Sequence, residues 1–302
     1  MVIPDYPFES HYFDRNGLRM HYLDEGGGDP VVMVHGNPTW SFYFRHLVLA
    51  LRDRHRVIVP DHIGCGLSDH PDQHAYDFRL QSRIDDLDAL LESLNLPNRV
   101  TLVVHDWGGM IGMAYAARHP EKIRRIVVLN TASFHMPKSK SFPALLWLGR
   151  NTALGAWLIL KCNAFCRLAN QIAAKRRQLT QAEKSAYLMP HDTVPRRISV
   201  LKFVQTIPLR ISDPGYDLVS AVESSLPKFA DVPMLIIWGL KDFIFDHHFL
   251  AEWERRFPKA EVHRYARSGH YILEDEREEA IEWIDDFFAR HPIPPSGAEA
   301  RQ

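Results

Sequence analysis

Short apolar runs alternate with helical patterns along most of this chain, and this alternation limits the fold more than any other feature. Each run is continuous, as expected of a strand that is buried on both faces of a sheet. The runs lie at residues 30–36, 56–61, 99–104, 126–129, 234–238 and 262–265. Between them, apolar residues recur at three- and four-residue spacing, as over 80–94, 249–257 and 280–288. The chain therefore predicts an α/β fold with a mostly parallel, twisted sheet that is flanked by helices.

Two parts of the chain depart from this rhythm. Residues 10–25 suggest two short strands joined at Asn16-Gly17, the dipeptide most typical of a tight hairpin. Residues 133–226 show helical patterns without a strand run, and several prolines interrupt them. We expect an α/β core at 1–132 and 227–290, an inserted helical cap at 133–226 and a disordered tail at 291–302.

Composition excludes several classes of protein. The 302 residues include 36 Lys and Arg against 37 Asp and Glu, so the net charge of -1 gives no reason to expect a nucleic-acid partner. Three cysteines are too few for a disulfide framework and suit a reducing compartment. The N-terminus lacks the apolar core of a signal peptide, and the longest apolar stretch is far shorter than the ~20 residues of a membrane-spanning helix. We expect a cytoplasmic protein with no transmembrane segment.

The segment that says most about function is 103–110, Val-Val-His-Asp-Trp-Gly-Gly-Met. It lies where an expected buried strand turns directly into an expected helix, an arrangement that presents a nucleophile at the edge of a sheet. Asp106 occupies the nucleophile position, and Gly108 and Gly109 supply the small residues that close helix–strand packing needs. The alternative is that Asp106 only caps the helix.

An aspartate nucleophile favours one class of substrate. A carboxylate that attacks an sp3 carbon forms an ester, which a water deprotonated by histidine can hydrolyse, whereas a serine would leave a stable ether. Asp106 therefore indicates a substrate with an electrophilic alkyl carbon, such as a halide, an epoxide or a strained ring.

Three further segments follow expected strands and complete a candidate site. His270 follows the last strand as a candidate base, and Asp242 follows the preceding strand, where it could hold the His270 tautomer. The loop 35–39, His-Gly-Asn-Pro-Thr, follows the first parallel strand, where an oxyanion-hole loop would lie. The order along the chain predicts a catalytic triad of Asp106, Asp242 and His270.

With these motifs the chain resembles the haloalkane dehalogenase branch of the α/β-hydrolase superfamily over about residues 10 to 290. The resemblance rests on 35–39, 61–69, 105–109, Asp242 and Gly269-His270. It implies the α/β-hydrolase fold with a cap, and it implies that Asn37 and Trp107 bind the leaving halide through hydrogen bonds. Some members of the family carry the triad acid after the strand that corresponds to residues 126–129. Here Asn130 and Thr131 follow that strand, and neither can be the triad acid. The chain is therefore similar to the subgroup whose acid lies at the position of Asp242.

The cap region narrows the resemblance further. Residues 203–209 and 217–223 are most similar to the OleB family, the β-lactone decarboxylases of bacterial long-chain olefin biosynthesis. This resemblance implies an enzyme in which Asp106 opens cis-β-lactones with long alkyl chains, giving cis-olefins and CO2. Whether Asp106 attacks the ring carbon or the carbonyl stays open, as does the role of His270 as base or acid.

Other functions remain in competition at this point. Haloalkane dehalogenation is the first alternative, because a halide and a lactone carboxylate are both anions that leave a carbon under attack. Epoxide hydrolysis is less favoured: Tyr187 and Tyr216 lie in the insertion, where such enzymes carry two proton-donating tyrosines, but Asn37 stands where those enzymes usually have an aromatic residue. A catalytically idle ligand-binding protein is disfavoured by the complete triad.

The insertion is unusually apolar between residues 142 and 174. This pattern fits a channel for a hydrophobic small-molecule substrate, a surface for a membrane or a partner enzyme, or a tightly packed pair of cap helices. Lys175, Arg176 and Arg177 follow directly and could touch anionic lipid or simply end a solvated helix. Olefin-pathway relatives work in multi-enzyme assemblies, so the resemblance also implies a possible partner.

The chain has 17 histidines, yet none shows the spacing of metal ligands. We expect His105 to point away from the pocket into a structural hydrogen bond. We expect residues such as His21, His62 and His119 to lie at the surface or at helix ends. The sequence thus predicts a site with no metal and no cofactor.

Overall fold

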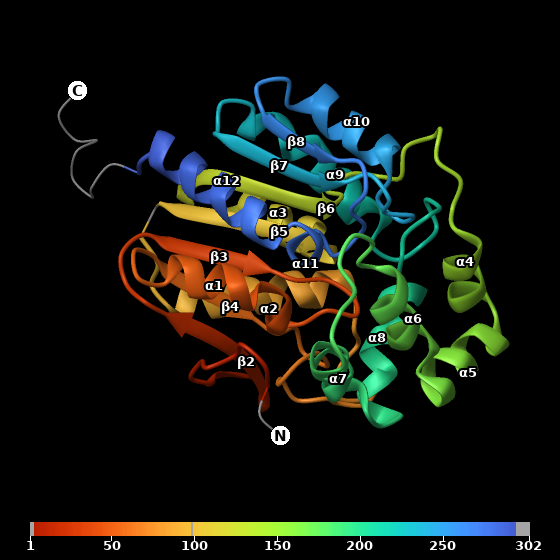
Figure 1. The fold of residues 1–302 in the computed structure, drawn as a ribbon. Helices are drawn as coiled ribbons and strands as arrows, with labels where there is room; N and C mark the ends of the chain where they lie inside the picture. The colour runs from red at the N-terminus through yellow and green to blue at the C-terminus, as the bar shows by residue number, and fades with distance from the viewer. Residues whose placement is uncertain (1–2, 98, 294–302) are drawn as a thin grey trace.

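A computed structural model of the protein describes residues 3–97 and 99–293. In it, an eight-stranded sheet forms the centre of the protein (Figure 1). The strand order is β1-β2-β4-β3-β5-β6-β7-β8. The strands are β1 (His11–Arg15), β2 (Leu18–Glu25), β3 (Pro30–Val34), β4 (Arg56–Pro60), β5 (Val100–Asp106), β6 (Ile123–Thr131), β7 (Met234–Gly239) and β8 (Glu261–Tyr265). β2 pairs antiparallel with β1 and β4, and every other pair is parallel. The predicted mostly parallel sheet is confirmed.

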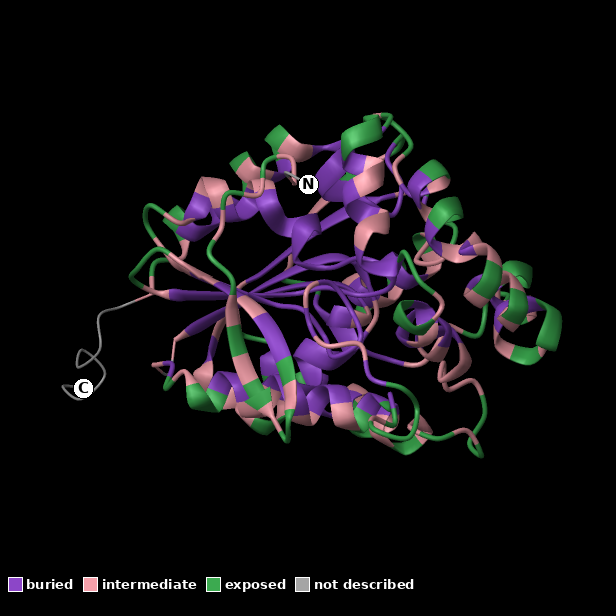
Figure 2. Cartoon of the chain, turned by 90° about the horizontal axis from the view of Figure 1, so that it is seen from below, coloured by how far each residue is buried: buried purple, intermediate pink, exposed green. Residues whose placement is uncertain are grey.

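Helices cover both faces of this sheet, and Figure 2 shows the strands as its buried interior. Alternate residues of the strands pack into two apolar clusters, as Val32 and Val34 do on one face and Val31 and Met33 on the other. The first face is covered by α2 (Leu80–Ser93), α3 (Trp107–Arg118), α9 (Tyr216–Ser225) and α10 (His247–Arg256). The second is covered by α1 (Arg45–Leu51), α11 (Ile272–Asp275) and α12 (Arg277–Arg290). Burial on both faces explains why the strand runs are continuously apolar.

A group of short helices lies beyond the carboxyl ends of the parallel strands (Figure 1). It consists of α4 (Ala144–Asn151), α5 (Ala153–Cys162), α6 (Ala164–Ile172), α7 (Gln181–Leu188) and α8 (Ile198–Gln205). α4 packs against α5 and α8, around a small apolar cluster of its own. The predicted cap also includes α9, but α9 packs against α3 of the core, so we propose that the cap consists of α4 to α8. Most of the tail predicted at 291–302 lies outside the described residues.

A buried cluster of charges joins this cap to the core. The Arg45 guanidinium of α1 donates to Glu274 of α11 at 2.5 Å and to Glu183 of α7 at 3.1 Å. Tyr187 of α7 donates its hydroxyl proton to Glu274 at 2.6 Å, and Arg177 donates to Glu183 at 2.7 Å. Each buried charge therefore has an opposite partner, as burial of charge requires.

The linker between α6 and α7 is held against the loop that precedes α11. The N–H of Tyr271 donates to the carbonyl of Ala173 at 2.9 Å. The buried Asp275 carboxylate accepts the N–H groups of Lys175, Arg176 and Arg177, at 2.8 to 3.0 Å. It also accepts the N–H of Gly269, at 2.7 Å. One carboxylate of α11 thus fixes residues 175–177 of the cap linker and Gly269 of the loop before α11.

Within the described ranges, no helix has the length and apolar character that crossing a bilayer requires.

Candidate active site

Asp106 lies at the junction of β5 and α3, where the backbone turns sharply. Its φ of 52° falls in the left-handed region, a strained conformation for a residue with a side chain. Two residues later, a Cβ on Gly108 would lie 1.9 Å from the carbonyl oxygen of Val34, so only glycine fits this contact between α3 and β3. The strand–turn–helix arrangement predicted for 103–110 is therefore present, with Asp106 at its apex.

The structure brings Asp106, Asp242 and His270 together from the ends of three different strands. His270 donates through Nδ1 to Asp242 Oδ2 at 2.7 Å, and its Nε2 lies 3.4 Å from Asp106 Oδ2. All three side chains are buried. The three residues that the sequence predicts as a triad thus form one connected group.

The two carboxylates control the protonation of the histidine between them. Burial alone lowers the pKa of His270, but the charges of Asp242 and Asp106 outweigh burial and raise its pKa to about 10. Burial would raise the pKa of Asp106, yet the adjacent His270 more than compensates and holds that pKa below its usual value. At neutral pH, the group therefore contains an imidazolium beside an ionised Asp106.

Asn130, at the end of β6, supports Asp242 and was missed as a site residue from the sequence. Its Nδ2 donates to Asp242 Oδ2 and to the carbonyl of Gly239, both at 3.0 Å. The N–H of Ile244 donates to the other Asp242 oxygen at 2.8 Å. The sequence identifies Asn130 only as a residue that cannot be the acid. Asn130 lies at the end of the strand that pairs with β7, and Asp242 follows β7. This position is the signal that would have identified Asn130 as a site residue.

The loop after β3 holds Asp106 through its backbone. The N–H of Asn37 donates to Asp106 Oδ1 at 2.6 Å, and a Cβ on Gly36 would lie 1.9 Å from that oxygen, so glycine permits the approach. The Asn37 side chain also bonds the cap, because its Nδ2 donates to the Val200 carbonyl of α8 at 3.3 Å. Asn37 therefore contacts both Asp106 and the cap.

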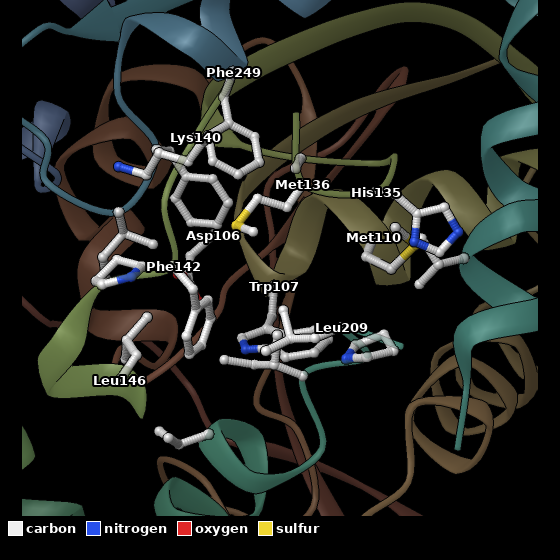
Figure 3. A pocket seen from close by; sticks show the side chains of 18 of the residues that line it. Asp106, Trp107, Met110, His135, Met136, Lys140, Phe142, Leu146, Leu209 and Phe249 are labelled. Carbon is white, nitrogen blue, oxygen red and sulfur yellow. The ribbon is translucent and has the colours of Figure 1, made fainter. Parts of the chain in front are cut away.

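Trp107 offers the hydrogen-bond donor that remains free. Its indole N–H makes no hydrogen bond to any described residue, and the ring lies against Phe203 with centroids 5.5 Å apart. Both predicted donors, Trp107 and Asn37, line the same cavity as Asp106. Figure 3 shows Trp107 next to Asp106.

The cavity in front of Asp106 is mainly apolar and encloses about 910 Å³, including the part that opens to solvent. Its wall includes Met110 of α3 and His135 on one side, and Phe142 and Leu146, which lie before and in α4, on the other. Figure 3 shows Asp106 and Trp107 between these two sides. Besides the site residues, Lys140 adds a charged group to the lining, and it pairs with Asp246 at 2.6 Å.

Neither tyrosine that would support epoxide chemistry lines this cavity. Tyr187 is buried and donates its hydroxyl proton to Glu274. Tyr216 stacks on His135 with ring centroids 4.0 Å apart, outside the lining. The geometry therefore supplies no tyrosine donor for an epoxide oxygen.

The histidine predictions have mixed outcomes. His105 donates through Nε2 to the carbonyl of His270 at 2.9 Å, so its predicted structural hydrogen bond is confirmed. The surface location expected for His21 and His62 is wrong, because both are buried. His21 Nδ1 lies 2.8 Å from an Asp61 oxygen, and His62 donates through Nε2 to the carbonyl of His35 at 3.0 Å.

Among the described residues, three groups of side chains bring potential metal-ligand atoms within 4.8 Å of one another. They are Asp246-His247-His248, His46-Glu183-Glu274 and Asp88-Glu92-His119. None of them lines the cavity, and each contains a carboxylate already paired with a cation, respectively from Lys140, Arg45 and Arg118. We assign no metal to these groups.

A family profile described as "alpha/beta hydrolase fold" matches residues 29–277, well over half of the chain. The chain belongs to the alpha/beta hydrolase fold family. The crystal structure of the haloalkane dehalogenase DatA from Agrobacterium tumefaciens C58 agrees with this. It matches this chain with a TM-score of 0.82 at 23% identity, over 93% of this chain and 96% of that one, so the two share a fold.

Curated relatives of this chain carry two kinds of name, decarboxylase and haloalkane dehalogenase. The chain is 56% identical to a cis-3-alkyl-4-alkyloxetan-2-one decarboxylase of Shewanella oneidensis, over 93% of this chain and 88% of that protein. It is 46% identical to the protein of that name from Xanthomonas campestris pv. campestris, over 97% and 100%. A haloalkane dehalogenase of Mycolicibacterium paratuberculosis is 32% identical, over 93% of each chain. An oxetan-2-one is a β-lactone, so the resemblance predicted from the sequence is confirmed.

Proposed function

We propose that this α/β-hydrolase is a β-lactone decarboxylase that converts cis-β-lactones with two long alkyl chains into cis-olefins and CO2. The observation that carries the proposal is the Asp106 carboxylate, which pairs with His270 and faces an apolar cavity. The relatives with 56% and 46% identity support the choice of substrate, because their names specify a cis-dialkyl oxetanone.

Asp106 is the proposed nucleophile, and the ring carbon that bears the lactone oxygen is its target. Attack there breaks the carbon–oxygen bond, forms an ester to Asp106 and frees the lactone carboxylate. That carboxylate then leaves as CO2, its electron pair forms the double bond, and the ester bond breaks to restore Asp106. Attack at the carbonyl would instead leave an alkoxide, which is a poor leaving group for olefin formation.

This route also preserves the cis geometry. Displacement by Asp106 inverts the attacked carbon, which places the new ester and the carboxylate on opposite sides of the bond between the two carbons. Elimination of such opposed groups leaves both alkyl chains on the same side of the new double bond.

In this proposal His270 acts as a cation rather than as a base for water. The overall reaction consumes no water, and the pKa of His270 near 10 keeps the ring protonated at neutral pH. The imidazolium stabilises Asp106 both before attack and when the carboxylate is expelled. Asp242, held by Asn130, orients the ring.

The remaining residues position the lactone. The free N–H of Trp107 is placed to donate to the ring oxygen as negative charge develops on it. The Met110–His135 and Phe142–Leu146 sides of the cavity each receive one alkyl chain, which places the four-membered ring between them, at Asp106.

Haloalkane dehalogenation is the second candidate, because the same Trp107 donor beside Asp106 would also stabilise a departing halide. That reaction needs a later hydrolysis of the Asp106 ester. His270 must then be neutral to deprotonate water, so it must lose its proton once the ester removes the charge of Asp106.

A parallel assay separates the candidates. Purified protein is offered a cis-β-lactone with two long alkyl chains, a 1-haloalkane and an epoxide, and olefin, CO2, halide and diol are measured. We expect olefin and CO2 in equal amounts from the lactone as the main activity. Fast halide release with an unreactive lactone would contradict the proposal.

A variant tests the assigned nucleophile. Asp106→Ala should abolish turnover of every substrate, while circular dichroism shows an intact fold. Retained turnover in this variant would remove Asp106 from the mechanism.

We also propose a cytoplasmic location and an association with olefin-pathway enzymes. The absence of disulfides among the three cysteines supports the first. The second rests on analogy to the relatives, and co-purification from a native host tests it.

A further inference from the structure

The outer helices of the cap expose large apolar side chains. Of nine such exposed side chains in the described part of the chain, five lie on α4, α5 and α6. They are Leu145, Trp147, Leu154, Trp157 and Leu168, with exposed fractions from 36% to 59%. Figures 1 and 2 show α4 and α5 at the end of the molecule away from the sheet, with exposed turns on their outer side. We call these five residues, with Lys161 and Arg167, the cap face.

The cap face is a second apolar surface on helices that already bury one. The inner sides of α4 and α5 pack through Leu146 and Ile159 into the apolar cluster of the cap. On α5, Leu154, Trp157 and Lys161 follow one another at intervals of three and four residues, so they share its outward stripe. In a helix that meets only water, this stripe would be polar.

The segment that carries the cap face contains basic residues and no acidic ones. No Asp or Glu occurs between Glu121 and Glu183, although the whole chain has a net charge of -1. From residue 138 to 177 this acid-free stretch contains Lys138, Lys140, Arg150, Lys161, Arg167, Lys175, Arg176 and Arg177. Four of these basic residues pair with acids from other segments: Lys140 with Asp246, Arg150 with Asp213, Arg176 with Glu276 and Arg177 with Glu183. The exposed Lys161 and Arg167 form no ion pair with a described residue.

The cap face is continuous with the wall of the substrate cavity. Leu146 of α4 lines that cavity, whereas its neighbours Leu145 and Trp147 face outward. A single helix therefore separates the cavity from the exposed apolar surface. An apolar molecule that reaches the cap face is one helix away from Asp106.

We propose that the cap face docks on the surface of an anionic lipid bilayer. Exposed tryptophan and leucine side chains fit the boundary between headgroups and acyl chains, and unpaired basic residues fit a negatively charged leaflet. The charge decides the occupant, because the unpaired Lys161 and Arg167 beside the exposed apolar side chains complement anionic headgroups. This inference goes beyond the proposed decarboxylase activity and does not depend on it. It places the enzyme where a molecule with two long alkyl chains dissolves.

Vesicle flotation with the full-length protein tests the proposal. We expect the protein to float with vesicles of equal parts phosphatidylglycerol and phosphatidylcholine, and at least tenfold less with phosphatidylcholine alone. Serine at Lys161 and Arg167 should weaken partitioning about fivefold per charge removed. Leu154→Ser with Trp157→Ser should weaken it at least as much, because it removes the apolar contact.

Trp283→Ser on α12 is the matched control, because Trp283 is an exposed tryptophan on a helix that contributes no residue to the cap face. It should leave flotation unchanged, and circular dichroism should show that all variants fold. No binding to anionic vesicles, or equal loss in the control, would overturn the proposal. So would equal binding to both kinds of vesicle, or light scattering that shows a dimer lost in the Leu154/Trp157 variant, since the cap face would then join two copies.

Discussion

His270 shows how two neighbouring carboxylates define the protonation state of one side chain of the candidate site. Its ring is buried between Asp242 and Asp106, and this placement, rather than the residue type, makes it cationic at neutral pH. The proposed mechanism uses the cation directly. The pH dependence of turnover therefore reports on this residue.

We expect kcat/KM on a β-lactone to stay level through neutral pH and to fall as the pH rises through about 10, where His270 loses its proton. The sign follows from a raised pKa, because the protonated form is the active one and persists below that value. Asp242→Asn removes one of the charges that raise the pKa of His270, so the decline should move to lower pH. Asp217→Asn, on the exposed start of α9, should leave the profile unchanged. A decline at the same pH in Asp242→Asn would contradict this account.

Trp107 permits a second test, because phenylalanine keeps the ring and removes only the N–H. Trp107→Phe should lower kcat by about 10²–10³, the usual loss of one donor to a developing anion, with a smaller change in KM. Steady-state kinetics measure this, with Trp283→Phe as a control. An unchanged kcat would show that the free indole N–H does not contact the reacting oxygen.

At the scale of elements, the junction of β5 and α3 depends on glycine for steric reasons. The Cβ that alanine would add at Gly108 meets the backbone of β3, which cannot move without disturbing the sheet. The same contact places Asp106 at the sheet edge. Glycine at position 108 is therefore required both for the stability of this junction and for the geometry of the site.

Gly108→Ala should lower the free energy of unfolding by about 3 kcal/mol, as overpacking against backbone does. Gly27→Ala is the matched control, because its Cβ would meet nothing within 4 Å, and it should change stability by less than about 1 kcal/mol. Urea unfolding compares the two variants. Equal stability would mean that α3 shifts to accommodate the methyl group.

The sequence predicts the elements better than it predicts their side-chain partners. The strands are recognisable because burial on both faces requires continuous apolar runs, and Asp106, Asp242 and His270 are found because each follows such a strand. Asn130 was missed because its role depends on the adjacent strand β7, and the burial of His21 depends on Asp61, forty residues away. Such pairings arise from tertiary contacts that no local pattern records.

At the scale of the whole molecule, the cap and the core are joined by the Arg45 cluster. Arg45 is buried with Glu274, and Glu183 of the cap completes the group. Burial would raise the pKa of Glu183, but Arg177 and Thr180 outweigh it and lower that pKa to about 2. A carboxyl group with a lowered pKa stabilises the fold at pH values above its ordinary pKa. For Glu183 this stabilisation is lost as the pH falls toward 2.

Arg45→Met should lower the free energy of unfolding by about 3–5 kcal/mol at neutral pH, because it leaves buried carboxylates without their partner. Arg54→Met is the control: its pair with Asp285 is half-exposed and should contribute about 1 kcal/mol or less. Urea unfolding at neutral and acidic pH measures both. The difference between Arg45→Met and the parent should shrink in acid, and a constant difference would argue against the charge-based explanation.

The hydrogen bonds between residues 173–177 and residues 269–275 limit how the cap can be exchanged in protein engineering. A cap transplanted from another hydrolase would need to bring a linker that satisfies Asp275 and the N–H of Tyr271, or the segment carrying His270 would lose its anchor. Tags, crosslinks and detergents that act on the cap also act on this anchor. Kinetic comparisons between preparations are therefore meaningful only when the cap is treated identically in each.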